Sequence, residues 1–390
     1  MKRDFKIWIG ALFVALFAGV AMAFGADHSA VVHASSAVPF GGMAIGAINM
    51  FDTRTMTRSL EQLYVPTSYL RDSFFGSIER HTTRYVDIDI VKGGRKVAAY
   101  VHPRNEGSKV DKRGFSTKSY KAPYTKEKMV TTAEEYLTRN AGDVIYTADT
   151  PEARAAKELG KNLRELGERV DRLEELQAAQ ALQTGKILVK GEDVDDIIDF
   201  GFAPEQLPVL TNTAKWSDTT NSTPLDDLQK WHEETRKRSG LVPSMVLADS
   251  AAIRFLLKNK NVIGNTGLLS SFRVTLGQID PQKMNAQGVK YWGYLQDPGI
   301  DLWSYDAYYE DPVSGLTVPY INPGTVLMIG EGARLTRHYG AIEDLGATAQ
   351  VSRFAKSWVT DDPSARWVMV QSAPLCVPHQ IDAITCATVL

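Results

Sequence analysis

Cysteine and net charge are both scarce in this sequence, and each shortage excludes a class of protein. The 390 residues include only two cysteines, Cys376 and Cys386, and the formal net charge is −2. Two cysteines provide neither a disulfide framework nor a cysteine-based zinc site, so we expect two free, buried thiols. A dedicated nucleic-acid binder usually carries a basic excess, so any contact with DNA should be local and non-specific.

Motifs for catalysis and cofactor binding are missing as well. The sequence contains no GxSxG, GxxxxGK[ST] or GxGxxG motif. Its seven histidines are scattered along the sequence; we expect His232 to be solvated on a charged helix face and His338 to be structural. An acidic group lacks the turn glycine of a calcium loop; its members are Asp193, Asp195, Asp196 and Asp199. We therefore expect no enzyme activity, no cofactor and no metal site.

The first 49 residues have the features of an export signal. A basic start, MKRDFK, precedes an apolar run, and Ala21-Met22-Ala23 has the small-x-small form of a signal-peptidase site. The run is close to the roughly 20 residues that a spanning helix needs, so an uncleaved anchor is the alternative. A glycine-rich linker follows, and a new pattern begins at Met50.

A basic hairpin is predicted after this start. Residues 84–91 alternate between apolar and polar, Gly93-Gly94 suits a turn, and residues 96–102 would form the returning strand. A long polar loop continues to Tyr124, and residues 92–128 contain 11 basic residues against 3 acidic ones. Such a segment cannot bury itself in a core of its own. It is either a solvated flap or an arm that reaches a neighbouring subunit.

One long helix gives the strongest local pattern. Five leucines and Val170 recur at spacings of three and four between Leu159 and Leu176, with Pro151 in the first turn of the predicted helix 151–184 and Gly185 after its last. At 1.5 Å per residue this helix would be about 50 Å long. The pattern also suits a coiled coil, but Gly160 and Gly167 lie on one face, where glycine allows another backbone to approach closely. We therefore favour a single helix on a sheet, within an α+β fold.

Four short segments near the C-terminus occur in a characteristic order. They are Tyr339-Gly340, the Trp-Val-Thr segment at Trp358, the Asp362-Pro363 turn with Arg366 soon after, and the strand Gln371–Leu375. This order resembles the phage lambda major capsid protein family. The segments MFDTRTM and PTSYLRDSFF resemble the start of such proteins, so the resemblance covers Met50–Leu390.

The resemblance implies the Hong Kong 97-type capsid fold. Its parts would be an N-terminal arm (50–82), an extended E-loop (83–128), a peripheral domain (129–240 and 335–390) with spine helix 151–184, and an axial domain (241–334). The implied function is that of a major capsid protein, which self-assembles into hexamers and pentamers to build the icosahedral head enclosing phage DNA. The implied partners are other copies, portal and scaffolding proteins, a head decoration protein and, non-specifically, packaged DNA.

The resemblance also implies roles for particular residues. Basic E-loop residues would lie at the subunit interface: Arg95, Lys96, Lys109, Lys112, Arg113 and Lys118. A second set would be structural: Gly160, Gly167, Trp358, Asp362, Pro363, Arg366, Trp367 and Gln371. In RWVMVQS, alternation puts Trp367 and Met369 on one face and Val368 and Val370 on the other. Two apolar faces predict a strand covered on both sides.

A shell protein of the virion would be assembled in the host cytoplasm. The export-signal features of residues 1–49 do not fit such a protein. Three accounts remain: a start assigned upstream of Met50, a pro-segment removed in maturation, or a genuine signal. The alternative function is an exported periplasmic ligand-binding protein with a cleft in its mixed lobe, and an enzyme whose motif escapes detection is a third.

Overall fold

The computed structural model describes residues 53, 56–57, 68–91, 115–137, 151–191, 194–264, 288–347 and 350–390, and five isolated positions between 98 and 106. The chain divides into two units, residues 1–48 and 49–390, and the described residues all belong to the second. The signal-like segment expected over residues 1–49 therefore lies outside the described residues. Among the helices that are described, none is both long and apolar enough to cross a membrane.

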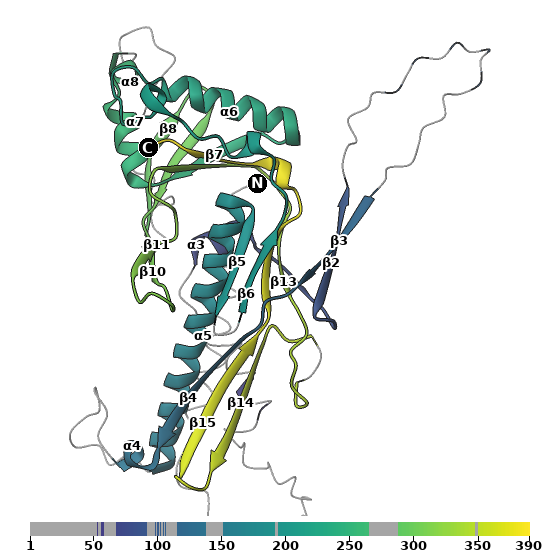
Figure 1. The fold of residues 1–390 in the computed structure, drawn as a ribbon, viewed down its shortest axis with the longest axis vertical. Helices are drawn as coiled ribbons and strands as arrows, with labels where there is room; N and C mark the ends of the chain where they lie inside the picture. The colour runs from purple at the N-terminus through teal and green to yellow at the C-terminus, as the bar shows by residue number, and fades with distance from the viewer. Residues whose placement is uncertain are drawn as a thin grey trace, which may run out of the picture. The chain divides into compact units, whose positions relative to one another are not determined.

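A single long helix, α5 (Pro151–Thr184), has the bounds that the sequence predicted (Figure 1). Its buried stripe, which includes Leu163 and Leu166, packs on Val368 and Val370 of a neighbouring strand. Towards its C-terminal end, small apolar side chains enter the largest core of the molecule. The helix lies on a sheet, as the single-helix interpretation predicted.

The two glycines of this helix have different surroundings. Gly160 is half-buried, and a Cβ added there would meet nothing within 4 Å. The expected close approach of another backbone is therefore wrong at Gly160. Gly167 is buried, and its carbonyl accepts a hydrogen bond from the Arg353 guanidinium at 3.5 Å.

Two three-stranded sheets both pack against α5. One has the order β14-β15-β4 and is antiparallel throughout, whereas in the other, β1-β13-β16, the first pair is parallel. The short helix α3 (Tyr69–Phe74) precedes β1 and packs on α5. The strand bounds are β1 (Ser77–Arg80), β4 (Thr125–Thr132), β13 (Leu335–Tyr339), β14 (Arg353–Thr360), β15 (Ala365–Ser372) and β16 (Pro374–Pro378).

The hairpin exists, but its strands pair differently from the prediction. Strand β2 (Tyr85–Val91) pairs with β3 (Phe115–Lys121), a segment whose sequence predicts a polar loop (Figure 1). The predicted returning strand over residues 96–102 is therefore wrong as the partner of β2. The predicted turn at Gly93-Gly94 lies outside the described residues.

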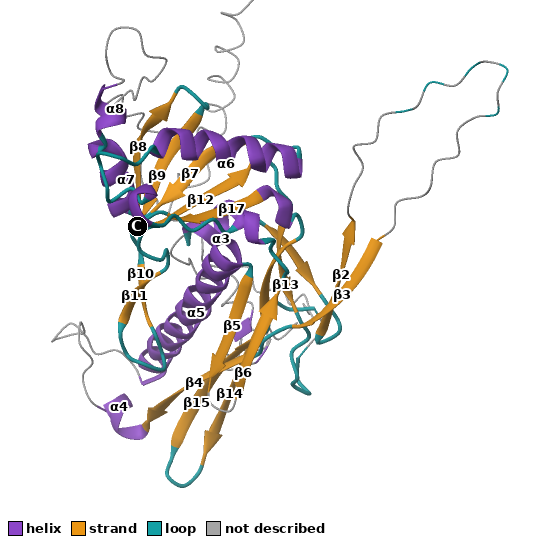
Figure 2. Cartoon of the chain, turned by 45° about the horizontal axis from the view of Figure 1, so that its top comes forward, coloured by secondary structure: helices purple, strands orange, loops and turns teal. Residues whose placement is uncertain are grey.

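A five-stranded sheet of order β17-β12-β7-β9-β8 forms the second large layer, with α6, α7 and α8 beside it (Figure 2). Its own core is built around Trp216, Leu228 and Trp231. Strand β17 and helix α6 belong to this layer, so it crosses the expected boundaries of the axial domain, which stay a prediction. The bounds are α6 (Pro224–Ser239), α7 (Ser250–Lys258), α8 (Lys260–Gly264), β7 (Pro243–Ala248), β8 (Val289–Leu295), β9 (Ile300–Tyr305), β12 (Thr325–Gly330) and β17 (Ile384–Thr388).

Smaller elements complete the α+β fold. Two hairpins, β5–β6 and β10–β11, and the helix α4 lie outside the larger sheets. Both cysteines are free and buried in the largest core, as the sequence predicted. The bounds are α4 (Ala133–Leu137), β5 (Lys186–Gly191), β6 (Val194–Asp199), β10 (Tyr308–Glu310) and β11 (Thr317–Pro319).

Five charged side chains lie together between α5 and its neighbours; three are buried and two arginines are largely shielded from water. Arg71 of α3 contacts Asp171 and lies 3.3 Å from Glu174, both on α5. Arg353 of β14 lies 2.5 Å from Asp171 and 3.1 Å from Glu174, and Arg337 of β13 lies 3.5 Å from Glu174. We call these five residues the buried charge cluster. It joins α3 and two separate sheets to one helix.

Neighbouring hydrogen bonds reinforce this junction. The carboxylate of Glu175 accepts hydrogen bonds from the backbone N–H groups of Leu70 and Arg71, at 2.9 and 2.8 Å, and from the Tyr305 hydroxyl at 2.7 Å. Burial alone would lower the pKa of the Arg353 guanidinium, but the adjacent carboxylates raise it overall. Arg353 therefore stays charged, and every member of the cluster has a group of opposite charge within 3.5 Å.

Replacing Arg353 with methionine should destabilise the unassembled subunit strongly. The change leaves Asp171 and Glu174 buried with one cation fewer, and breaking a buried pair typically costs about 3–5 kcal/mol. We expect about 3 kcal/mol in urea unfolding, because Arg71 and Arg337 still face the carboxylates. The matched control is Arg172→Met on the exposed side of α5, which loses only the 3.2 Å pair with Glu168 and should cost less than about 0.5 kcal/mol. Equal costs would contradict a structural role for the cluster.

Candidate subunit interfaces

The stem of the basic hairpin is anchored on one side and exposed on the other. Val86 and Ile88 of β2 are buried in the largest core, and the Tyr120 ring on β3 lies 5.4 Å from that of Phe200. Lys118 of β3 is exposed. The other predicted interface residues lie outside the described residues: Arg95, Lys96, Lys109, Lys112 and Arg113. The interface role of all six stays a prediction, whereas the stem is fixed to its own subunit.

Lys118 belongs to a small charged surface beside the stem. Lys186 of β5 lies 2.9 Å from Asp199 of β6. The pKa of Asp199 is lowered first by its hydrogen bond with Lys186, and the charge of Lys118 contributes further. Asp195, Asp196 and Asp199 are exposed along β6, and Asp193 lies outside the described residues. The acidic side chains are thus spread along a hairpin edge and do not converge on one point.

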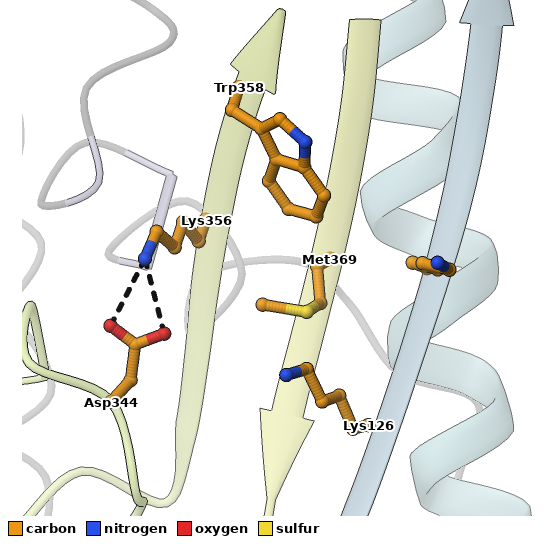
Figure 3. A pocket seen from close by; sticks show the side chains of 6 residues that line it. Lys126, Asp344, Lys356, Trp358 and Met369 are labelled. Atoms are coloured by element: carbon orange, nitrogen blue, oxygen red, sulfur yellow. Dashed lines mark hydrogen bonds and ion pairs between the residues drawn. The ribbon is translucent and has the colours of Figure 1, made fainter. Parts of the chain in front are cut away.

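An open face with two tryptophans lies on the side of the β14-β15-β4 sheet opposite α5. Trp358 and Trp367 are directly paired across β14 and β15, and their rings stack at 6.2 Å with an angle of 9° between them. Met369 lies beside Trp358 (Figure 3). The Lys128 ammonium is 4.8 Å from the ring centre of Trp367. We call this surface the tryptophan face; it consists of Lys126, Lys128, Lys356, Trp358, Trp367 and Met369.

The tryptophan face is a shallow pocket and not a covered core. Trp358 and Trp367 are half-buried, whereas Val368 and Val370, which point towards α5, are fully buried. The predicted alternation is confirmed. Among the described residues, however, only the side towards α5 is fully covered, because Met369 on the other side is buried but both tryptophan rings are half-exposed. Sequence alternation showed that both faces are apolar. It could not show which of them another element covers.

The remaining predicted structural residues lie around this face. Asp362 and Pro363 form the exposed turn between β14 and β15, joined by a cis peptide bond, and Arg366 is half-buried on β15. Gln371 is buried; its amide donates to Asp344 at 3.1 Å, and its carbonyl oxygen accepts from the Tyr124 hydroxyl. Lys356 lies 3.3 Å from the same aspartate (Figure 3).

Asp344 links Gln371 and Lys356. Its pKa is lowered first by the backbone N–H of Gly346, which donates to it at 2.9 Å, and then by Gln371 and Lys356. The loop before β14 is therefore tied to the sheet by a charged carboxylate, at the edge of the tryptophan face.

The histidines are less scattered in the structure than in the sequence. His81, His338 and His379 lie together, with His338 2.8 Å from His81 and 3.0 Å from His379 on its two ring nitrogens. Burial, followed by the neighbouring histidines and Arg334, lowers the pKa of His338 to about 3. His232 is buried on α6 and burial lowers its pKa, so its predicted solvation is wrong.

These features define a class of protein before any comparison. A long helix clamps two sheets together, an anchored hairpin extends from them, and a sheet face with aromatic and basic side chains stays open. This is the arrangement of a structural subunit with surfaces for other macromolecules. The family model described as phage major capsid protein E matches residues 52–389, and this chain belongs to that family.

Relatives with curated descriptions extend over most of the chain. The major capsid protein of Enterobacteria phage P21 is 26% identical over 349 residues, which are 85% of this chain and 96% of that protein. The major capsid protein of Escherichia phage lambda is 25% identical over 347 residues, 84% of this chain and 96% of that protein. The family resemblance inferred from the C-terminal segments is therefore confirmed.

A solved structure has the same fold. A crystal structure of a prophage capsid protein from Escherichia coli CFT073 superposes with a TM-score of 0.65 at 19% identity, covering 87% of this chain and 99% of the other. The Hong Kong 97-type fold that the resemblance implied is confirmed by this match.

Replacing Trp367 with alanine tests whether the tryptophan face is open in the free subunit. A half-buried ring loses less contact than a fully buried one, so we expect a cost of about 1–2 kcal/mol in chemical unfolding. The control is Trp216→Ala, because Trp216 is 1% exposed and stacks on Trp231 in the second core. Removing such a ring should cost about 3–5 kcal/mol. A Trp367 variant as unstable as the Trp216 variant would show that another element covers the face.

Proposed function

We propose that this chain is the major capsid protein of a tailed-phage head, a structural subunit without catalytic activity. Copies assemble into hexamers and pentamers that close into an icosahedral shell around DNA. The observation that carries this proposal is the extent of the family match, which covers residues 52–389 and thus almost the whole second unit. The proposed site of action is the virion, after assembly in the host cytoplasm.

The hairpin supports contacts between copies. A two-stranded hairpin on its own is marginal in water, so a long basic extension beyond the stem gains order by lying on another surface. Residues 92–114, beyond the stem, contain 7 basic residues and 2 acidic ones, and an acidic neighbouring surface would complement them. Such charge pairs fix partner and register more than they add affinity. A head-to-tail contact of this kind repeats around a ring until it closes.

Further partners follow from the proposed function. A shell subunit meets portal and scaffolding proteins during assembly, and a head decoration protein is a candidate for the outer surface. The net charge of −2 supports only non-specific contact with packaged DNA. The exported ligand-binding alternative has support only from residues 1–49, and the family match begins after them.

Removing the extension beyond the stem should abolish shells without unfolding the subunit. Residues 92–114 would be replaced with a short Gly-Ser linker, which keeps β2, β3 and the buried Val86 and Ile88. The variant should unfold cooperatively at a temperature close to that of the unmodified chain, because no described core residue is removed. Negative-stain electron microscopy of protein expressed with its scaffolding protein should then show rings or free subunits only. Normal closed shells would mean that the segment is a solvated flap.

Charge reversal tests the electrostatic part of the same contact. Glutamate at Lys109, Lys112 and Arg113 should weaken assembly, and more so at low salt, because exposed charges are screened beyond roughly 8–10 Å near physiological ionic strength. A charge-matched control places glutamate at the exposed Lys230, Arg236 and Lys258. Light scattering at two salt concentrations follows shell formation. An equal effect of both triple variants would assign the defect to net charge and not to the hairpin.

A further inference from the structure

Three strands bring a glutamate and three histidines together at the root of the hairpin. Glu79 of β1 lies opposite His338 of β13 in the parallel ladder, and His81 follows β1 directly. The backbone N–H of His81 donates to the carbonyl of Tyr339 at 2.9 Å, which holds this residue next to β13. We call Glu79, His81, His338 and His379 the histidine cluster.

The donor atoms of three of these residues converge on one point. His338 Nδ1 lies 2.8 Å from His81 Nε2 and 3.7 Å from Glu79 Oε2, and one donor atom from each residue falls within 4.8 Å of the others. A zinc ion bound at about 2.0–2.1 Å in tetrahedral geometry separates neighbouring nitrogen ligands by roughly 3.3 Å. The separations of His338 Nδ1 from His81 Nε2 (2.8 Å) and from Glu79 Oε2 (3.7 Å) lie on either side of this value, so small side-chain movements would accommodate an ion.

The fourth residue completes a feature found in histidine metal sites. His379 Nε2 lies 3.0 Å from His338 Nε2, on the ring edge opposite Glu79 and His81. If His338 donates its Nε2–H to His379, its Nδ1 keeps a free electron pair that points towards the other two ligands. A metal-bound histidine commonly has its second ring nitrogen fixed in this way.

We propose that Glu79, His81 and His338 bind one divalent transition-metal ion of the zinc type, with water at the remaining position. Two imidazoles and one carboxylate suit zinc, cobalt, nickel or copper, whereas calcium and magnesium prefer oxygen ligands alone. Binding displaces the proton shared between His81 and His338, so that His81 carries its proton on Nδ1. The sequence predicted no metal site, because residues 79–81 and 338 are far apart along the chain.

Competing contacts are weak enough to yield to an ion. Arg334 lies 3.5 Å from Glu79 Oε1, which leaves Oε2 to face the histidines, and the arginine side chain is 69% exposed. An ion at this point would fasten the end of β1 to β13 immediately before the hairpin stem. It would therefore limit the movement of the stem relative to its own subunit.

Metal binding by the full 390-residue chain tests the proposal without reference to assembly. Protein stripped with EDTA would be titrated with Co²⁺, whose visible absorption reports tetrahedral coordination, and then with Zn²⁺ in calorimetry and elemental analysis. We expect one ion per chain and a rise in unfolding temperature when Zn²⁺ is added. Because His338 is buried, the variants are His81→Ala, expected to weaken binding at least 100-fold, and Glu79→Gln, expected to weaken it about 10-fold.

The control is His102→Ala, an exposed histidine outside the cluster, which should leave the affinity unchanged. Equal binding by the unmodified chain and the His81 variant would place the ion elsewhere and overturn the proposal. Binding only at millimolar Zn²⁺, with no change in unfolding temperature, would also overturn it. The cluster would then be a hydrogen-bonded group of histidines without a metal.

Discussion

The buried carboxylates of α5 are the constraint on which the rest of the fold depends. Asp171 and Glu174 are almost fully shielded from water, and an unpaired buried charge costs several kcal/mol. The arginines that compensate for them come from α3, β13 and β14, and each of these segments is far from α5 in the sequence. The helix can therefore be buried only when all three segments have returned to it. This requirement joins the N-terminal segment and both three-stranded sheets into one frame.

That frame explains how the subunit can carry exposed contact surfaces. A shell is held by many weak contacts that are repeated between copies, and such contacts add up only if each subunit keeps its geometry. The hairpin stem is anchored through Val86 and Ile88, so its extension starts from a fixed point. The tryptophan face presents a large stacked pair beside lysines on the sheet that α5 supports. The frame around α5 is stiff, and the surfaces suited to partners lie at the edges of this frame.

Local signals predicted the long helix, whereas long-range contacts decided the features that were missed. Pro151, Gly185 and the leucine spacing lie in one continuous segment, so the helix bounds could be read directly. The strand that pairs with β2 could not be predicted in this way. The glycine turn at residues 93–94 is a local signal, whereas the pairing depends on the burial of Val86 and Ile88 by residues that are distant in the sequence. The charge and histidine clusters need the register of β13 beside its neighbours. The ordered C-terminal segments revealed the family, but not which sheet face stays open.

A cryo-electron microscopy reconstruction of the assembled particle tests the central claim most directly. The account predicts a closed shell of hexamers and pentamers in which the α5 frame is unchanged. The segment beyond β2 and β3 would lie on a neighbouring copy, with its basic side chains against acidic ones. A particle in which this segment folds back on its own subunit would contradict the account. So would a protein that stays monomeric at high concentration with its scaffolding protein present.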